Sequence, residues 1–233
     1  MFDEEIVCLF DNETANMIND PLPYDMGYQL VGTKTFNIYE RRSFVIQEIF
    51  MNKELMNSAY YAKKLPQYWE DLKSGKRVMK RITTVKKIVA EDFKKYNVKR
   101  VGAYNMNFDK RACNKGIRYT TGSFYRWFFP YGTEFFDLWH GACSSFLRSK
   151  HFIKWALKNG FVSEAGNIKT SAEVAYRYIT KNVDFVESHT GLEDVEIETE
   201  IFKKIFKCKM KYDFSVVGSP WRIVQNYRYE MGL

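Results

Sequence analysis

The sequence predicts an α/β fold in which helices flank a mixed β-sheet. Residues 6–10 form an apolar run, and two further strand-like segments, 28–35 and 44–50, follow it with polar turns between them. These segments are expected to form an antiparallel meander. Apolar residues recur at steps of three and four between 84 and 97, which indicates an amphipathic helix, and a short apolar strand follows at 98–104. A strand, a helix and a strand in that order imply a parallel crossover, and therefore a mixed sheet.

The composition is that of a globular protein with a net positive charge. The 233 residues suit one large domain, 1–233, or one domain with an insertion, and 45% of them are hydrophobic. Lys and Arg number 36 against 28 Asp and Glu, which gives a net charge of +8. This excess of positive charge is compatible with a polyanionic partner, although many basic proteins bind none.

The cysteines predict neither a disulfide framework nor a zinc site. Cys8, Cys113, Cys143 and Cys208 lie far apart and form no C-x-x-C pair, so reduced and mostly buried thiols in a cytoplasmic protein are expected. His140 precedes Cys143 closely enough to suggest metal ligands, but without a second pair a helix-face histidine is the better interpretation. The N-terminus is acidic and no apolar run approaches the length of a membrane span, so we expect no membrane association.

Residues 52–81 resemble an insertion. The segment is helix-prone but interrupted by Pro66 and Gly75, and it mixes aromatic rings with Lys and Arg side chains. Such a mixture can follow a single nucleic-acid strand by charge and stacking. A solvated helical surface with its aromatic rings turned inward is an equally good interpretation.

The second half of the chain predicts several helices. The aromatic block 124–131 has no clean period and is expected to be core, ahead of a base-stacking surface. A helix should follow 135–139, and another should stop near Gly160. Thr170 and Glu173 fit a capping box for a helix over 172–180. The last long helix is expected to open at 189–194.

Four carboxylates stand out by their positions. Asp11 and Glu13 follow the first apolar run two residues apart, so in a strand they project the same way. Asp109 follows the 98–104 strand at its carboxyl end, where α/β sheets place ligands, or else caps a helix. Asp194 shares the apolar stripe of the last helix, and a carboxylate on a buried face needs a partner. A divalent cation with oxygen ligands is the usual partner for such a set.

Three segments in this order resemble the three exonuclease motifs of the DEDDh family. They read FDNET at 10–14, AYNMNFD at 103–109 and HTGLED at 189–194. The histidine five residues before the aspartate marks the histidine branch of that family. Four positions depart from the common pattern without removing a carboxylate or the histidine: Asn12, Tyr104, Gly191 and Val195. Residues 169–180 resemble phage-encoded members.

The resemblance implies a ribonuclease H-like mixed sheet of five strands and a metal-dependent 3′–5′ exonuclease. Such an enzyme would hydrolyse single-stranded DNA or RNA and release nucleoside 5′-monophosphates. Two divalent cations, Mg²⁺ or Mn²⁺, would be held by four carboxylates, and His189 would be the general base. These metal-binding and catalytic carboxylates are Asp11, Glu13, Asp109 and Asp194. Thr14 and Asn105 are secondary candidates for contacting the terminal nucleotide or positioning the ligands.

The chemistry itself sets requirements that these residue types meet. Hydrolysis of a phosphodiester needs an activated water, neutralisation of charge on the phosphoryl oxygens and help for the leaving oxygen, which two metal ions can supply. A histidine titrates near neutral pH and can take the proton of the water. Lysines between 203 and 211 would help to hold the strand. The alternatives are a catalytically degenerate nucleic-acid-binding protein and a scaffold whose acids serve as caps and surface charge.

Overall fold

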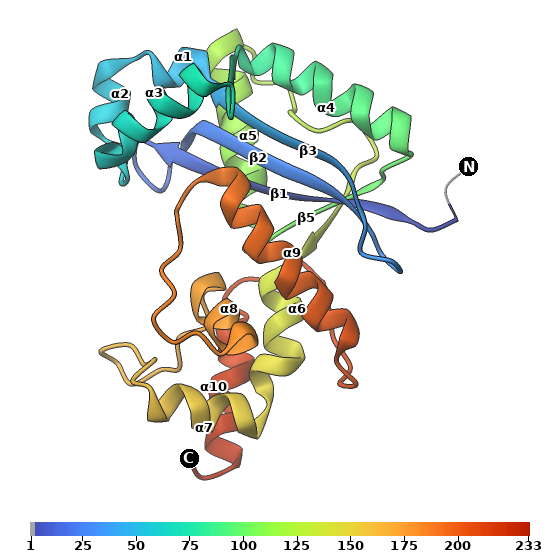
Figure 1. The fold of residues 1–233 in the computed structure, drawn as a ribbon, viewed down its shortest axis with the longest axis vertical. Coiled ribbons are helices and arrows are strands. Elements are labelled where there is room, and N and C mark those ends of the chain that lie inside the picture. Colours follow the sequence, from blue (N-terminus) through green and yellow to red (C-terminus); the bar gives the residue numbers. More distant parts are fainter. Residues whose placement is uncertain (1–2) are drawn as a thin grey trace. The chain divides into compact units, whose positions relative to one another are not determined.

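The computed structural model describes residues 3–233, and in this range six strands form one sheet in the order β4-β3-β2-β1-β5-β6 (Figure 1). The strands are β1 (Ile6–Ala15), β2 (Leu22–Gly32), β3 (Ile38–Ile46), β4 (Val78–Lys80), β5 (Arg100–Ala103) and β6 (Glu134–Asp137). The pairs β1–β2 and β2–β3 are antiparallel, and β3 pairs with β4 in parallel. The predicted mixed α/β sheet is therefore confirmed, together with its antiparallel meander.

Ten α-helices accompany the sheet in the described part of the chain. They are α1 (Gln47–Phe50), α2 (Lys53–Asn57), α3 (Leu65–Ser74), α4 (Ile82–Tyr96), α5 (Met106–Thr121), α6 (Leu138–Ser144), α7 (Lys150–Lys158), α8 (Ala172–Thr180), α9 (Gly191–Lys207) and α10 (Trp221–Glu230). Two 3₁₀ turns lie at Ala62–Lys64 and Phe146–Arg148. None of the helices described is long and apolar enough to cross a membrane.

The sheet has six strands instead of the predicted five, and several of its strands begin or end at other residues than predicted. The strand β4 lies in the segment 52–81, for which the sequence predicted interrupted helices and no strand. The second strand starts at Leu22 instead of 28, and all of its residues to Gly32 are buried. The third strand ends at Ile46, and residues 47–50 form a helical turn instead. Local apolar runs located these strands but did not fix their ends.

The chain divides into two compact units, each assembled from three separate segments. The first unit contains the chain up to Val101, with Phe108–Glu134 and His189–Val195; the second contains Gly102–Asn107, Phe135–Ser188 and Glu196–Leu233. Neither unit corresponds to one continuous stretch of sequence. The single exonuclease domain over 1–233 stays a prediction.

In the first unit, helical residues pack on both faces of the sheet. Tyr28 on β2 donates from its hydroxyl to Asp92 on α4 at 2.6 Å, and Arg42 on β3 donates to the same carboxylate at 3.1 Å. Gly27 precedes Tyr28 and therefore faces the other way. A Cβ atom at Gly27 would lie only 2.3 Å from the amide nitrogen of Leu192 on α9. The first turn of α9 thus lies directly against the backbone of β2.

The aromatic block 124–131 is divided between core and surface. Phe128 and Phe129 are buried, and their ring centroids lie 6.2 and 5.3 Å from that of Phe10. The other large rings of the block are exposed: Phe124 (83%), Tyr125 (92%), Trp127 (57%) and Tyr131 (108%). The expectation that the block is core is therefore wrong for most of its rings, since no period in the sequence separated the two groups.

In the second unit the predicted helix over 172–180 is found with a different cap. The Ser171 hydroxyl accepts the hydrogen bond from the amide of Val174, so Ser171 is the N-cap of α8. Thr170, the expected cap, instead accepts a hydrogen bond from the Trp139 indole at 2.9 Å. Glu173 pairs with Arg177 at 2.6 Å. The capping box is therefore wrong, although the helix itself is correct.

Two further features of the second unit bear on the sequence predictions. His140 is buried on α6, where its Nδ1 atom lies 2.8 Å from the carbonyl oxygen of Ser215, and Cys143 is a buried free thiol. This matches the interpretation of a helix-face histidine. The chain also forms α10 after the helix that was expected to be the last one.

Replacing Gly27 by alanine should destabilise the first unit. The new methyl group would collide with backbone atoms of Leu192, which cannot move aside as a flexible side chain does. Forced overpacking of this kind costs about 1–3 kcal/mol, measurable as a lower denaturant midpoint at constant m-value. Gly218→Ala is the matched control, because no atom lies within 4 Å of a Cβ at that position. Equal midpoints for the two variants would contradict the close approach of α9 to β2.

Candidate metal and catalytic site

The first two predicted carboxylates lie on β1 and share one face of the sheet. Asp11 and Glu13 are half-buried, and their cross-strand neighbours on β2 are Gly27 and Asp25. Gly27 is the residue against which α9 packs. The expectation that the two acids project the same way is therefore confirmed, and both point to the face that carries the start of α9.

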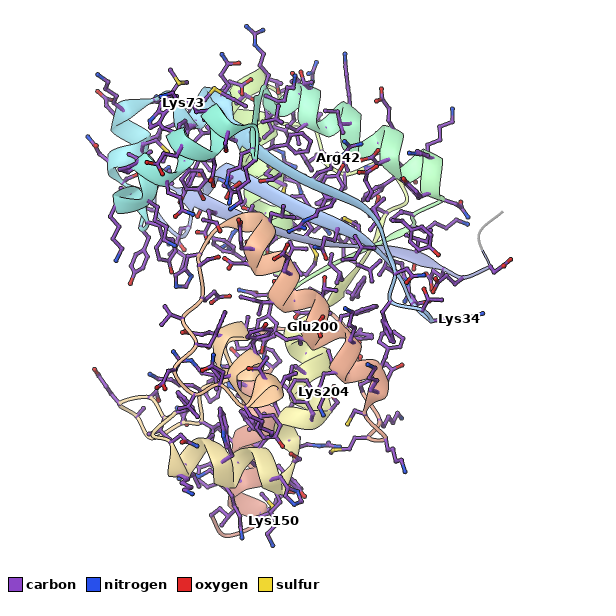
Figure 2. The ribbon with its side chains drawn as sticks, in the orientation of Figure 1. Lys34, Arg42, Lys73, Lys150, Glu200 and Lys204 are labelled. Atoms are coloured by element: carbon purple, nitrogen blue, oxygen red, sulfur yellow. The ribbon has the colours of Figure 1, made fainter. Side chains whose placement is uncertain are left out.

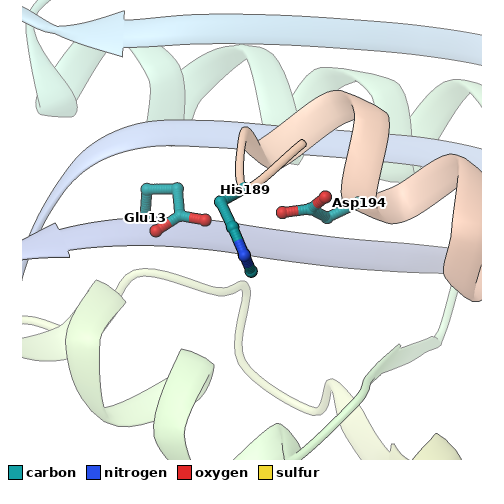
Figure 3. Close-up of side chains that lie close together, drawn as sticks. All are labelled: Glu13, His189 and Asp194. Carbon is teal, nitrogen blue, oxygen red and sulfur yellow. The ribbon is translucent and has the colours of Figure 1, made fainter. Parts of the chain in front are cut away.

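Three side chains on this face converge. Glu13, His189 and Asp194 each offer one oxygen or nitrogen atom, and these atoms all lie within 4.8 Å of one another. Figure 3 shows the carboxylates of Glu13 and Asp194 on either side of the His189 ring. Asp194 is buried, as expected from its place on the apolar stripe of α9. Carboxylate oxygens with an imidazole nitrogen are a suitable donor set for a divalent cation.

Asp109 lies within the first turn of α5 and is buried. It is not the cap of that helix, because the helix already begins at Met106. Its Oδ1 atom accepts a 2.7 Å hydrogen bond from the side-chain amide of Asn12 on β1. Burial, and then the negative charges of Asp109 and Asp11, raise the pKa of the Cys113 thiol. Asp109 and Asp11 therefore both contribute to the electrostatic environment of the Cys113 thiol. Neither belongs to the group formed by Glu13, His189 and Asp194.

A buried ion pair fixes the start of α9. Asp25 is fully buried, and its carboxylate accepts hydrogen bonds from the amide of Gly191 at 2.9 Å and from the hydroxyl of Tyr68 at 2.7 Å. The guanidinium of Arg77, itself only 1% exposed, donates to Asp25 at 3.0 Å. The hydrogen bonds from these donors replace those that the carboxylate would make with water in the unfolded chain. Because Gly191 lies between His189 and Asp194, both side chains are positioned by this pair.

A close contact explains why position 191 is a glycine. A Cβ atom there would lie 2.9 Å from the amide nitrogen of Gly27. The first turn of α9 and the middle of β2 therefore approach each other through two glycines. This close approach brings Asp194 to the same face of the sheet as Asp11 and Glu13.

Glu193 links the start of α9 to the inserted segment. It accepts hydrogen bonds from Thr190 at 2.7 Å and from Arg77 at 2.6 Å, and it pairs with Lys76 at 2.7 Å. Burial alone raises the pKa of the Glu193 carboxyl, but the hydrogen bond from Lys76 and the charge of Arg77 outweigh it and lower the pKa from 4.5 to about 2. The ionised carboxylate therefore stabilises the folded state at neutral pH.

The inserted segment also contacts the histidine itself. The ring of Tyr61 stacks on that of His189, with centroids 4.2 Å apart and an interplanar angle of 13°. His189 has a φ of +50°, a conformation that non-glycine residues adopt only when their surroundings hold them there. The Tyr61 ring and the hydrogen bond that fixes Gly191 supply such surroundings.

Sequence reasoning missed the residues that support the site. In the inserted segment, Tyr68 is buried, as the interpretation of inward-turned aromatic rings expects, but Tyr60 and Trp69 are exposed. Arg77 is buried too, although that interpretation placed the cations in solvent. One feature of the sequence could have indicated Asp25: it is an acidic residue within the mostly apolar stretch 22–32. No comparable pattern marks Tyr61, because a tyrosine next to another tyrosine predicts no particular contact.

The remaining predicted residues lie in different places. Thr14 is half-buried on β1, one residue beyond Glu13. Asn105 belongs to the second unit, where it is exposed and lines a cavity of about 550 Å³ together with Trp139 and Trp221. Lys204 projects from α9, where the neighbouring Lys203 pairs with Glu200 (Figure 2). The roles of these side chains in holding a substrate stay predictions.

Comparison with known proteins shows similarity of structure without similarity of sequence. No protein-family model matches the chain, and no curated protein matches it. Among solved structures, E. coli exonuclease I in complex with a dT13 oligonucleotide superposes with a TM-score of 0.57 at 15% identity, covering 88% of this chain and 41% of that one. The zinc-bound form of that enzyme with single-stranded DNA gives 0.53 at 14% identity, covering 84% and 39%.

A second protein is similar over more of its own length. A 3′-exonuclease that recognises the 3′ end of the histone mRNA stem-loop superposes with a TM-score of 0.53 at 10% identity, covering 93% of this chain and 72% of that one. The chain thus has the ribonuclease H-like fold of these exonucleases, as its motifs predicted. It spans only about two fifths of the length of exonuclease I.

The contribution of Glu193 to stability should depend on pH. An acid whose pKa is lowered in the folded state stabilises it fully above its ordinary pKa and loses this effect as pH falls. Glu193→Gln should therefore lower the free energy of unfolding at neutral pH, and the difference from the unmodified protein should shrink between about pH 4.5 and pH 2. Denaturant titrations across that range measure it, with the exposed Glu91 changed to glutamine as control. A difference independent of pH would contradict the ionic role.

Proposed function

We propose that this chain is a metal-dependent 3′–5′ exonuclease that hydrolyses single-stranded DNA or RNA and releases nucleoside 5′-monophosphates. The convergence of Glu13, His189 and Asp194 within 4.8 Å, on a fold shared with exonucleases, carries this proposal. Asp11 on the same strand face supports it. The buried Asp109, whose carboxylate accepts a hydrogen bond from Asn12 on β1, is proposed as the fourth acid.

The side chains suit divalent cations of the hard type. Asp11, Glu13, Asp109 and Asp194 would hold two ions, and Mg²⁺ and Mn²⁺ are the metals that favour such carboxylate oxygens. When bound, these cations supply neutralisation of phosphoryl charge and activation of water. The four carboxylates bring about four negative charges, so two dications leave the site neutral and accessible to a phosphodiester.

His189 is proposed to act as the general base. A base must lie within hydrogen-bond reach of the proton that it takes, directly or through one water. The ring is placed beside the two carboxylates of Glu13 and Asp194 and is held there by stacking on Tyr61. Rotation of the imidazole away from the scissile phosphate is thereby restricted, which lowers the cost of reaching a reactive geometry.

The substrate is proposed to be the 3′ end of a single strand. The net charge of +8 favours a polyanion. Similar structures include complexes with a single-stranded oligonucleotide and with an mRNA stem-loop whose 3′ end is recognised. Because these two proteins act on different nucleic acids, the proposal covers DNA and RNA alike.

Purified protein with Mg²⁺ or Mn²⁺ should shorten 3′-unpaired oligonucleotides one nucleotide at a time. His189→Ala should slow this by about 10²–10⁴-fold, the usual contribution of a general base, and Asp11→Ala should abolish it because a metal-binding carboxylate is lost. Gel analysis of end-labelled substrate measures both, with the exposed Glu91→Ala as control. Binding without degradation in either metal would overturn the enzymatic proposal.

The same assay tests polarity. An oligonucleotide with a blocked 3′ hydroxyl and a free 5′ end should resist digestion, whereas blocking the 5′ end should have no effect. Chromatography of the product should show 5′-monophosphates. Undiminished digestion of the 3′-blocked strand would exclude a 3′–5′ exonuclease.

Tyr61 should influence the rate through its contact with His189. Tyr61→Ala removes the ring that stacks on the imidazole, and a misplaced catalytic group slows a reaction by up to about 100-fold. We expect kcat to fall by about 10-fold or more with KM nearly unchanged, since Tyr61 acts on the base and not on the strand. Tyr61→Phe keeps the ring and should retain nearly the full kcat. Equal losses in both variants would argue against positioning by stacking.

A further inference from the structure

A second feature of the first unit lies at the C-terminal end of α5. The chain from there to residue 131 carries five exposed aromatic rings, and we call them the aromatic surface: Tyr119, Phe124, Tyr125, Trp127 and Tyr131. The chain that carries them is anchored, because Phe128 is buried and its amide donates to the Asn114 side chain at 2.9 Å. Large rings held in solvent by an ordered backbone indicate a binding surface, since burial would otherwise be favourable.

The same stretch carries positive charge only. Residues 110–133 contain no Asp or Glu, and their cations are Lys110, Arg111, Lys115, Arg118 and Arg126. The guanidinium of Arg118 lies 4.5 Å from the centroid of the Trp127 ring, and its Nε atom donates to the carbonyl of Arg126 at 3.2 Å. Lys86 on α4 donates to the carbonyl of Trp127. Cations and flat rings are therefore interleaved at this surface.

A cavity of about 340 Å³ adjoins these rings. Its lining combines two aromatic side chains with two cations and one acid: Asp20, Leu22, Lys115, Arg118, Tyr119, Gly122 and Phe124. The acid, Asp20, forms a 2.5 Å ion pair with Lys115, so these two charges compensate each other and Arg118 gives the lining its net positive charge. A volume of this size is at the lower end of small-molecule sites and suits a single flat group.

We propose that the aromatic surface and its cavity form a second binding site for single-stranded nucleic acid. A base of the strand stacks on Tyr119 and Phe124, and its phosphates meet the cations of α5. Rings with interleaved cations are the features by which proteins bind single strands without sequence preference. The positive charge favours this occupant over an apolar protein surface.

The site would contact nucleotides upstream of the one that reacts, and in this respect it rests on the proposed exonuclease function. Asp109 and Tyr119 lie on the same helix, ten residues apart, which corresponds to about 15 Å along its axis. A strand with its 3′ end at the candidate catalytic site would therefore have to extend over several nucleotides to reach the aromatic surface. The affinity of substrates too short to reach the aromatic surface should not depend on its rings.

The test measures binding without hydrolysis. Oligodeoxythymidylate of about 15 and about 3 nucleotides is titrated in EDTA against the unmodified protein and the double variant Tyr119→Ala/Phe124→Ala. We expect the variant to bind the longer strand about 10-fold to 100-fold more weakly, as for the loss of stacking, and the shorter one equally well. Tyr229→Ala, an exposed tyrosine on α10, is the matched control. Equal affinities for the longer strand would overturn the inference and leave a protein partner as the use of this surface.

Intrinsic fluorescence gives a second measurement that does not depend on the stability of the double variant. Binding of the longer strand should quench tryptophan emission, and Trp127→Phe should remove a large part of that quenching. Quenching that persists in full would contradict a strand at this surface. The outcome is separable from the proposed function: a protein that binds strands here but degrades none retains this site, whereas a protein that degrades strands with unchanged affinity in the double variant lacks it.

Discussion

The buried contact between Asp25 and Arg77 is the interaction on which the candidate site depends. Removing two opposite charges from water is costly, and the contact is stable only because the remaining hydrogen-bonding capacity of both groups is used. Asp25 accepts from Tyr68 and Gly191, and Arg77 also donates to Asp71 and Glu193. Loss of either partner would leave an uncompensated charge in the core. It would also release the first turn of α9, and with it His189 and Asp194.

This arrangement gives the inserted segment a definite purpose. Its helices were an unexplained addition to an α/β sheet, yet Arg77 and Tyr68 bind the carboxylate that anchors α9, and Tyr61 stacks on the histidine. The insertion therefore supports the proposed catalytic residues through side chains that lie outside its strand β4. These contacts help to hold the histidine in its left-handed conformation.

The sequence predicted the features that depend on local patterns and missed those that depend on contacts between distant segments. Alternation along a strand placed Asp11 and Glu13 on one face, and helical periodicity placed Asp194 on a buried face, because both patterns are local. The contacts of Asp25 with Arg77 and Gly191 join distant segments, and no local pattern indicates them. The prediction that the aromatic block 124–131 is core was wrong for a similar reason. Phe128 and Trp127 are neighbours in sequence, but only Phe128 is buried in the core.

The hydrogen bond from Gly191 to Asp25 spans 166 positions in the chain. Bringing such distant residues together costs loop-closure entropy, so contacts of this kind tend to form late in folding. The antiparallel pairs of β1, β2 and β3 are by comparison local and close much shorter loops. A partly folded chain would thus carry Asp11 and Glu13 on its sheet before His189 and Asp194 arrive. Under the proposed function, nuclease activity would therefore report that the chain has completed its folding.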